Sequence, residues 1–430
     1  MQNQSSKILI SGGRILDPAF GRDAVGDLLI EEGIIREVGL NLSLKGDIQR
    51  IDAAGKLVVP GLIDLHTHLR EPGFEYKETV ATGIAAAVAG GFTTICAMPN
   101  TDPVNDNRSV TELILERAIA TGKAHVLPVG AITKGSKGEE LAEIGELIDA
   151  GCVAISDDGR PVMNSELMRR AMEYAKIFDI PVIDHCEDLH LSAGGVMFEG
   201  EVSTALGLKG IPAASETVMV ARDLALAELT GAKVHLAHIS AAGSVHLIRE
   251  AKRRGIAVTA ETCPHYFILT HDRLRGFDAN AKMKPPLAAQ HDLEEIRAGL
   301  ADGTIDAIAT DHAPHAAQEK EREIDQAPFG IIGLETALSL SLSLVEEGVL
   351  TLPALIQKLT ENPARILGKK IGRLGVGDAA DVTLIDPSAE WLVEAGSFRS
   401  KSKNSPFIGW KMKGRATVVI VSGKVVWELS

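Results

Sequence analysis

The stretch Leu62-Ile-Asp-Leu-His66-Thr-His68 decides the fold, because it joins an apolar run typical of a buried strand to two histidines. Seven further apolar runs of similar length follow it along the chain. They are Thr94-Ile-Cys-Ala-Met98, Val126-Leu-Pro-Val-Gly130, Cys152-Val-Ala-Ile-Ser156, Val182-Ile-Asp-His185, Val234-His-Leu-Ala-His238, Ala257-Val-Thr-Ala-Glu261 and Ala307-Ile-Ala-Thr-Asp311.

Amphipathic helical stretches separate most of these runs, among them residues 165–178, 215–230 and 243–254. Alternation of strands and helices predicts parallel strands joined by crossover helices. Eight such units over about 250–300 residues match the size of a (β/α)₈ barrel. A doubly wound open sheet is the alternative, and the absence of a Gly-x-Gly-x-x-Gly motif after an early strand disfavours it.

The two ends of the chain differ from this middle part. Both are rich in short β-type runs separated by glycine turns, such as 26–30 near the start and 416–426 near the end. We predict a small β-sandwich domain built from both termini. The predicted boundaries are 1–60 and 366–430 for its two parts and 61–365 for the barrel.

Composition narrows the class of protein. The 430 residues carry 44 Lys and Arg against 58 Asp and Glu, so 44 − 58 gives a net charge of −14. This acidic balance argues against non-specific nucleic-acid binding. The start of the chain lacks the pattern of a signal peptide, and the uncharged stretch 79–101 is interpreted as a buried helix followed by a buried strand, not a membrane span. Four cysteines without a Cys-x-x-Cys pair fit a cytoplasmic protein with reduced thiols.

Histidines and aspartates stand where the predicted strands end. They are His66, His68, the pair Asp157-Asp158, His185, His238 and Asp311. In a parallel barrel these ends gather at one face, where active sites lie. Six ligands are too many for one tetrahedral zinc and suit two metal ions with an anionic bridge. Either Asp157 or Asp158 could bridge, but neighbours on a strand face opposite ways, so we expect only one to do so.

The other histidines are expected to play smaller roles. His235 has the opposite strand parity to His238 and should face away from the barrel axis. His265, past a strand end, is a weaker candidate for the site, and one of His312 and His315 is expected near the substrate. Five are expected in helices or loops, solvated and without partners: His125, His190, His246, His271 and His291.

Several motifs together resemble a known family. They are His66-Thr-His-Leu-Arg70-Glu-Pro-Gly73, Met98-Pro-Asn100, Ser156-Asp-Asp-Gly159, Asp184-His-Cys-Glu187, Ala237-His-Ile-Ser240, Ala309-Thr-Asp-His-Ala-Pro-His315 and Pro328-Phe-Gly330. The sequence resembles the bacterial type I dihydroorotases of the amidohydrolase superfamily nearly from end to end. Run 152–158 contains no lysine, which fits the branch of that superfamily in which an aspartate bridges the metals.

The resemblance implies two zinc ions per chain. His66, His68 and Asp311 would hold the first, His185 and His238 the second, and Asp158 would bridge them. The implied reaction is the reversible cyclisation of N-carbamoyl-L-aspartate to L-dihydroorotate in pyrimidine synthesis, by a metal-bound hydroxide with Asp311 as general acid/base.

The resemblance also implies the substrate contacts. Arg70 would clamp the substrate carboxylate as a planar fork. Contacts from His68, Asn100, His315, Phe329 and Gly330 would complete the set. Relatives often carry Asn before the Pro-Pro-Leu turn and Arg after it, where this chain has Lys284 and Ala288. Lys284 therefore stands at a substrate-contact position with an altered side chain.

Alternatives remain. A hydantoinase or allantoinase would share the chemistry, although these relatives usually bridge with lysine and need no Arg70-type clamp. An inactive scaffold for aspartate transcarbamoylase should have lost metal ligands, and none is missing. Binding of that enzyme and a homodimer are implied by the resemblance alone. The charged segment 316–327 is expected to be a solvated loop or a lid that closes over substrate.

Overall fold

The computed structural model describes residues 7–42 and 46–429, so the first six residues, where the sequence lacks the pattern of a signal peptide, lie outside the described part. Within it, eight parallel strands form one sheet in the order β15-β14-β13-β10-β9-β8-β7-β6. A parallel bridge between Thr67 and His312 joins the two edges and closes the barrel. The predicted (β/α)₈ architecture is confirmed, and the open-sheet alternative is excluded.

The barrel strands are short and almost entirely buried. Their bounds are β6 (Leu62–Thr67), β7 (Phe92–Ala97), β8 (His125–Gly130), β9 (Ala154–Ile155), β10 (Val182–Asp184), β13 (Val234–Leu236), β14 (Val258–Thr262) and β15 (Ala307–Ile308). Continuous apolar runs suit such strands because helices cover the outer face while side chains fill the interior.

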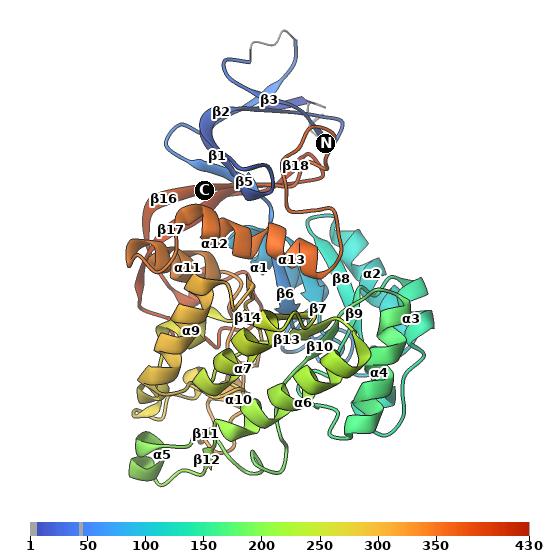
Figure 1. The fold of residues 1–430 in the computed structure, drawn as a ribbon. Helices are drawn as coiled ribbons and strands as arrows, with labels where there is room; N and C mark the ends of the chain where they lie inside the picture. Colours follow the sequence, from blue (N-terminus) through green and yellow to red (C-terminus); the bar gives the residue numbers. More distant parts are fainter. Residues whose placement is uncertain (1–6, 43–45, 430) are drawn as a thin grey trace.

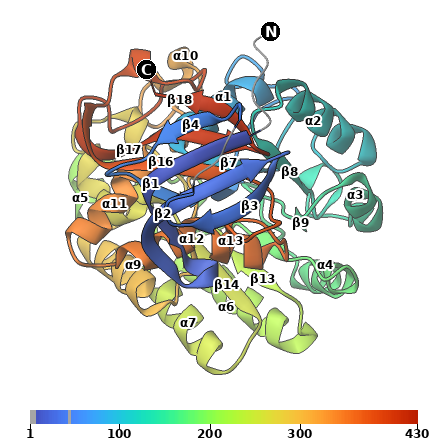
Figure 2. The ribbon, with the colours of Figure 1, turned by 90° about the horizontal axis from the view of Figure 1, so that it is seen from above.

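Helices form a ring around the strands (Figures 1 and 2). They are α1 (Val80–Gly90), α2 (Arg108–Thr121), α3 (Ile144–Ala150), α4 (Ser165–Ile177), α6 (Ala214–Thr230), α7 (Ala242–Arg253), α9 (Gln290–Asp302), α11 (Ala337–Glu346) and α12 (Leu352–Leu359). A further helix, α13 (Glu361–Ile366), lies across the amino end of the barrel (Figure 1), where Ile366 packs in the same apolar cluster as Leu65. Short pieces occupy the loops: β11 (Met197–Phe198), α5 (Glu201–Leu206), β12 (Gly210–Ile211), α8 (Pro264–Ile268) and α10 (Ala317–Lys320). Stretch 79–101 forms α1 and β7, as predicted, and no described helix combines the length and apolar character needed to cross a bilayer.

Both ends of the chain build a second sheet above the barrel (Figure 1). Its strands are β1 (Lys7–Asp17), β2 (Arg22–Glu31), β3 (Ile34–Gly39), β4 (Gln49–Asp52), β5 (Leu57–Pro60), β16 (Val382–Leu392), β17 (Lys411–Val421) and β18 (Lys424–Glu428). They are hydrogen-bonded in one continuous, mostly antiparallel sheet in which β16 pairs with β5. The predicted β domain built from both termini is confirmed as this sheet, and the boundaries 1–60, 61–365 and 366–430 stay predictions.

The β domain rests on the amino ends of the first barrel strands. Gly61, just before β6, donates its backbone N–H to Asp381 at 2.9 Å, and the Thr383 hydroxyl donates to the Gly91 carbonyl at 2.7 Å. The carboxyl ends of the strands therefore point away from this domain. One segment, residues 393–410 between β16 and β17, leaves the sheet and packs on the loops beside those carboxyl ends.

Candidate metal centre

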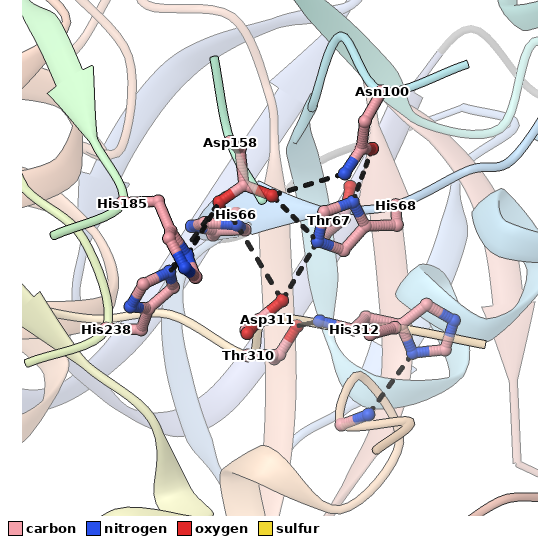
Figure 3. A network of polar contacts seen from close by, with 12 residues as sticks. His66, Thr67, His68, Asn100, Asp158, His185, His238, Thr310, Asp311 and His312 are labelled. Atoms are coloured by element: carbon pink, nitrogen blue, oxygen red, sulfur yellow. Dashed lines mark hydrogen bonds and ion pairs between the residues drawn. The ribbon is translucent and has the colours of Figure 1, made fainter. Parts of the chain in front are cut away.

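The six predicted ligands meet at the carboxyl ends of the barrel strands (Figure 3). Each is at most 5% exposed. They follow or end five different strands: His66 and His68 at β6, Asp158 after β9, His185 after β10, His238 after β13 and Asp311 after β15. Parallel strands of one barrel share this face, and residues far apart in sequence converge on it for that reason.

Asp158 lies at the centre of the cluster. Its Oδ1 is 3.3 Å from His66 Nε2 and 3.6 Å from both His185 Nδ1 and His238 Nε2. Its Oδ2 is 3.4 Å from His68 Nε2. Asp158 thus belongs to two trios of ligand atoms, one with His66 and His68 and one with His185 and His238, while Asp311 groups with His66 and His238.

Buried carboxylates behind two of the histidines fix the orientation of their rings. His66 Nδ1 donates to Glu261 Oε1 at 3.1 Å, and His185 Nε2 donates to Glu187 Oε2 at 2.8 Å. A carboxylate only accepts, so the proton sits on the nitrogen that faces it. The other ring nitrogen, Nε2 of His66 and Nδ1 of His185, then presents a lone pair to the cluster. This is the carboxylate–histidine arrangement of metal sites.

Asn100 plays the same part for His68. Its Oδ1 lies 2.8 Å from His68 Nδ1, and its Nδ2 donates to Asp158 Oδ2 at 3.3 Å. One amide therefore holds an imidazole and a carboxylate together. His68 Nε2, freed by this contact, lies 3.0 Å from Asp311 Oδ1.

The donor set fits a pair of divalent cations. His66 Nε2 and Asp158 Oδ1 are buried and have no hydrogen-bond partner among the described residues, a costly state unless an ion satisfies them. The pKa of Asp158 lies well below its ordinary value; burial opposes ionisation, but the nearby imidazole rings of His66, His185 and His238 outweigh it. Four imidazoles with two carboxylates suit borderline ions such as zinc, cobalt or manganese.

Asp157 turns away from the cluster. Its carboxylate accepts the backbone N–H groups of Ile132, at 2.8 Å, and Thr133, at 3.1 Å, and the Thr133 hydroxyl. Of the two neighbouring aspartates, only Asp158 therefore faces the histidines, as expected from the sequence.

Backbone strain marks this face of the barrel. The backbone φ angles of His238, Asp311 and Arg70 are 37°, 44° and 63°. These values lie in the left-handed region, which residues other than glycine rarely adopt. Such conformations persist where surrounding contacts hold them, and they are concentrated at functional sites.

A pocket opens beside the cluster and contains every predicted substrate contact. Its lining includes His68, Arg70, Asn100, Lys284, Asp311, His315, Phe329 and Gly330. Gly330 approaches the His315 ring so closely that a Cβ atom on it would lie 2.7 Å from His315 Cδ2. Only glycine fits at this position.

Arg70 is the conspicuous cation of the pocket. Its Nε donates to the Pro314 carbonyl at 3.2 Å, and its Nη2 lies 3.5 Å from His315 Nε2. Among the described residues no carboxylate forms an ion pair with it. A half-buried guanidinium without a carboxylate partner favours a bound anion.

Lys284 is engaged from the other side. Its Nζ lies 2.6 Å from Glu187 Oε1 and 5.1 Å from the centre of the Phe329 ring. Burial opposes ionisation of Glu187, but His185 and Lys284 bring the pKa of its carboxyl down to about 2. Lys284 thus lines the pocket and also reaches the metal centre through Glu187 and His185.

The prediction for His235 is wrong. Its ring lies 2.8 Å from the Thr259 hydroxyl and 3.1 Å from Glu261 Oε2, the same carboxylate that holds His66. Parity counted back from His238 fails because the chain has already left strand geometry there, at φ 37°. His235 therefore belongs to the inward-facing network.

Three of the five histidines expected to be solvated have partners. His125 lies on β8 and is 3.0 Å from Asp381, and His246 is 3.1 Å from Glu295. His271 is buried against the Phe198 ring. Exposed positions at 190 and 291 agree with the expectation.

Of the three weaker histidine candidates, only one lines the pocket. His315 lines the pocket, whereas His312 lies 3.3 Å from Glu78 and accepts the Gly333 N–H. His265 stacks edge-on against Tyr266, and burial lowers its pKa to about 3, so it is neutral. No hydrogen bond in the described chain joins it to the six ligands.

Segment 316–327 is partly anchored. Most of it is exposed, as expected of a solvated loop, but it contains α10, and Lys320 is 7% exposed. Lys320 Nζ donates to the carbonyls of Ala279 and Pro328, both at 2.8 Å. Closure of this segment over substrate stays a prediction.

Sequence reasoning missed the residues that support the site. They are Glu187, Glu261, Lys77 and Asn404. Glu187 and Glu261 stand at or just past the ends of predicted strands, as the ligands do, so the same signal could have found them. Nothing in the sequence connects Asn404 to a loop ninety residues away.

Comparisons with known proteins agree with this geometry. Residues 55–244 match a family model described as "Dihydro-orotase-like". Proteins named dihydroorotase from Geobacter metallireducens and Geotalea daltonii are 58% and 59% identical, over 98% and 97% of this chain and 99% of each relative. A solved L-hydantoinase from Arthrobacter aurescens superimposes with a TM-score of 0.88 at 25% identity, covering 98% of this chain and 96% of that one.

The fold and site thus define an amidohydrolase-type enzyme with a metal-binding centre. Within that class, the chain belongs to the dihydroorotase family.

Proposed function

We propose that this protein is a dihydroorotase, which reversibly cyclises N-carbamoyl-L-aspartate to L-dihydroorotate. The observation that carries the proposal is Arg70, a cation in the pocket beside the metal centre that forms no ion pair with a carboxylate of the described residues. Dihydroorotate carries a ring carboxylate that can pair with it, whereas hydantoin and allantoin do not. The close relatives named dihydroorotase support the same substrate.

Six residues would hold two zinc ions in this proposal. His66, His68 and Asp311 would hold one ion and His185 and His238 the other; the central position of Asp158 suits it to be shared by the two ligand groups. Such a pair supplies a hydroxide at neutral pH and polarises the carbonyl that is attacked.

The chain's own groups orient the substrate and move the proton. Arg70 and His315 receive the ring carboxylate, and Asn100, Lys284 and the Phe329-Gly330 backbone contact the rest of the molecule. Asp311 lines the pocket and stays ionised, since nearby His66 and His68 lower its pKa against the effect of burial. It therefore accepts the proton of the attacking water and passes it to the leaving ring nitrogen.

A steady-state assay tests the function. Purified protein is supplied with dihydroorotate, hydantoin, allantoin and dihydrouracil, which is the same ring without the carboxylate. We expect turnover of dihydroorotate to exceed that of the other three by at least about tenfold, the value of one charge-assisted contact. Preference for a ring without the carboxylate would overturn the proposal in favour of a hydantoinase.

The proposal extends to the setting of the enzyme. We infer a cytoplasmic location, a homodimer, and association with aspartate transcarbamoylase. Metal analysis, light scattering and co-migration of the two purified enzymes on gel filtration test the metal, the dimer and the association in turn.

A further inference from the structure

Lys77, which is not one of the proposed substrate contacts, lies against His315. We call Arg70 and His315 together the carboxylate clamp. Lys77 Nζ lies 3.3 Å from His315 Nδ1. The other ring nitrogen, His315 Nε2, lies 3.5 Å from Arg70 Nη2. The imidazole thus sits between two cationic side chains, and the Glu319 carboxylate, with Oε2 3.6 Å from His315 Nδ1, lies beside Lys77.

Proton counting makes these two contacts mutually exclusive as hydrogen bonds. Ammonium and guanidinium groups only donate, and a neutral imidazole has one acceptor nitrogen. Burial, followed by the charges of Arg70 and Lys77, keeps the pKa of His315 far below its ordinary value, so the ring is neutral. One nitrogen accepts from a cation, and the other carries the proton.

Nδ1 lies closer to the Lys77 ammonium, at 3.3 Å, than to Glu319 Oε2, which at 3.6 Å is beyond hydrogen-bond distance, so Lys77 is favoured as its donor. With Nδ1 accepting from Lys77, Nε2–H points toward Arg70, and two donors face one another across 3.5 Å. That arrangement is unfavourable alone but suits an anion placed between them. The substrate carboxylate of the proposed function is such an anion.

We propose that Lys77 is a positioning residue that fixes His315 as the Nε2–H tautomer, so that His315 and Arg70 donate together to the substrate carboxylate. This inference rests on the proposed function for the identity of the anion. The tautomer itself follows from the contacts of this chain.

Lys77 is held firmly enough for this role. Its Nζ forms an ion pair with Glu319 Oε1 at 3.1 Å, and its carbonyl accepts the Ser402 hydroxyl at 2.6 Å. The side chain is 13% exposed. Glu319 lies on α10, where its carboxylate also accepts the Ala316 N–H at 3.0 Å. The segment 316–327 is thereby tied to the clamp through one ion pair.

The test uses Lys77→Met, which keeps the stem and removes the donor. Nitrogen NMR of histidine-labelled protein reports the tautomer, with the His315 signal assigned by its loss in His315→Asn. In wild type we expect Nε2 protonated and Nδ1 free; in Lys77→Met we expect Nδ1–H to become populated, with Arg70 donating to Nε2.

Kinetics supply the second readout. Lys77→Met should raise KM for dihydroorotate about tenfold with kcat changed less than threefold. Inhibition by orotate, which has the carboxylate, should weaken by a similar factor, and inhibition by uracil, which lacks it, should not change. Lys77→Arg should restore the KM for dihydroorotate and the inhibition by orotate, because the guanidinium again donates a hydrogen bond. Lys134→Met, an exposed lysine paired with Glu140, is the matched control.

The outcomes separate the two proposals. An unchanged tautomer in Lys77→Met, or equal effects on orotate and uracil, would show that Lys77 only packs and would overturn the inference. If Lys77→Met fails to fold, Lys77→Gln is measured by the same criteria. Wild-type protein that turns over no dihydroorotate contradicts the proposed function, and the tautomer with orotate binding then still decides the role of Lys77.

Discussion

The site has two halves that are built differently: a metal half, made of the six proposed ligands, and a clamp half, made of Arg70 and His315. Metal-centre residues sit at the ends of buried strands, and three of the histidines are each oriented by one neighbour, as Glu261 orients His66. Clamp residues lie on loops: Arg70 follows β6, and His315 follows β15. Their support comes from other loops and from the chain segment between β16 and β17.

This difference shows how the position of each functional side chain is fixed. Strand ends of a closed barrel have fixed positions, so a ligand there needs only a partner for its second polar atom. A loop has no such frame. It gains order from many contacts, as when Asn404 accepts the His315 N–H at 3.0 Å and donates to the carbonyls of Ala313 and Gly330.

The largest effect is expected from the centre of the metal half. Asp158→Asn removes the anionic bridge, so metal content should fall well below two ions per chain and turnover more than about 10⁴-fold, because activation of water near pH 7 depends on the metals. Plasma mass spectrometry and the dihydroorotate assay measure the two quantities.

Asp157→Asn is the matched control for that variant, because its carboxylate faces Ile132 and Thr133. It should keep its metal and most of its rate. Two retained ions in Asp158→Asn would remove the bridge from the proposal.

Asp311→Asn tests where the two halves meet, since Asp311 touches His68 and also lines the pocket. Loss of a proton carrier costs about 10²–10⁴-fold in rate. We expect kcat to fall in this range while circular dichroism and the melting temperature stay close to wild type. A variant that keeps a tenth of its rate would place the proton carrier elsewhere.

Arg70→Met tests the clamp half alone. A hydrogen bond to a charged group contributes about 1.5–3 kcal/mol, so KM for dihydroorotate should rise about 10–100-fold. Binding of uracil, measured as competitive inhibition, should hardly change, and neither should the metal content. The exposed Arg117, paired with Glu71, provides an Arg→Met control. Equal weakening of dihydroorotate and uracil binding would contradict a carboxylate clamp.

The smallest effect is expected for Lys284→Met. Its ammonium is already paired with Glu187, so it has less charge to offer a substrate than Arg70. KM should rise less than about tenfold, since the pair is partly open to solvent. A rise equal to that of Arg70→Met would make Lys284 a second clamp residue.

Sequence reasoning reached the metal half more fully than the clamp half. The barrel and its eight strands follow from apolar runs with helical stretches between them, and all six predicted ligands meet. His235 failed because strand parity does not survive a residue in the left-handed region. His125 failed because its partner, Asp381, lies in the other domain.

The clamp shows the same limit in another form. Arg70 and His315 were found through motifs, but Lys77 and Asn404 act through contacts between segments with no periodic signal. Pairing of a loop with a distant segment depends on how the whole chain packs, and no local pattern encodes it. Lys284 lines the pocket as expected, but no pattern in the sequence predicts its ion pair with Glu187.

The reach of Asn404 across the molecule has a consequence for biosynthesis. A chain emerging from the ribosome can assemble every barrel strand before residue 404 has been translated. The loop bearing His315 then still lacks its hydrogen bonds to Asn404, so we expect the nascent barrel to gather its metal-site residues before this side of the substrate pocket is ordered.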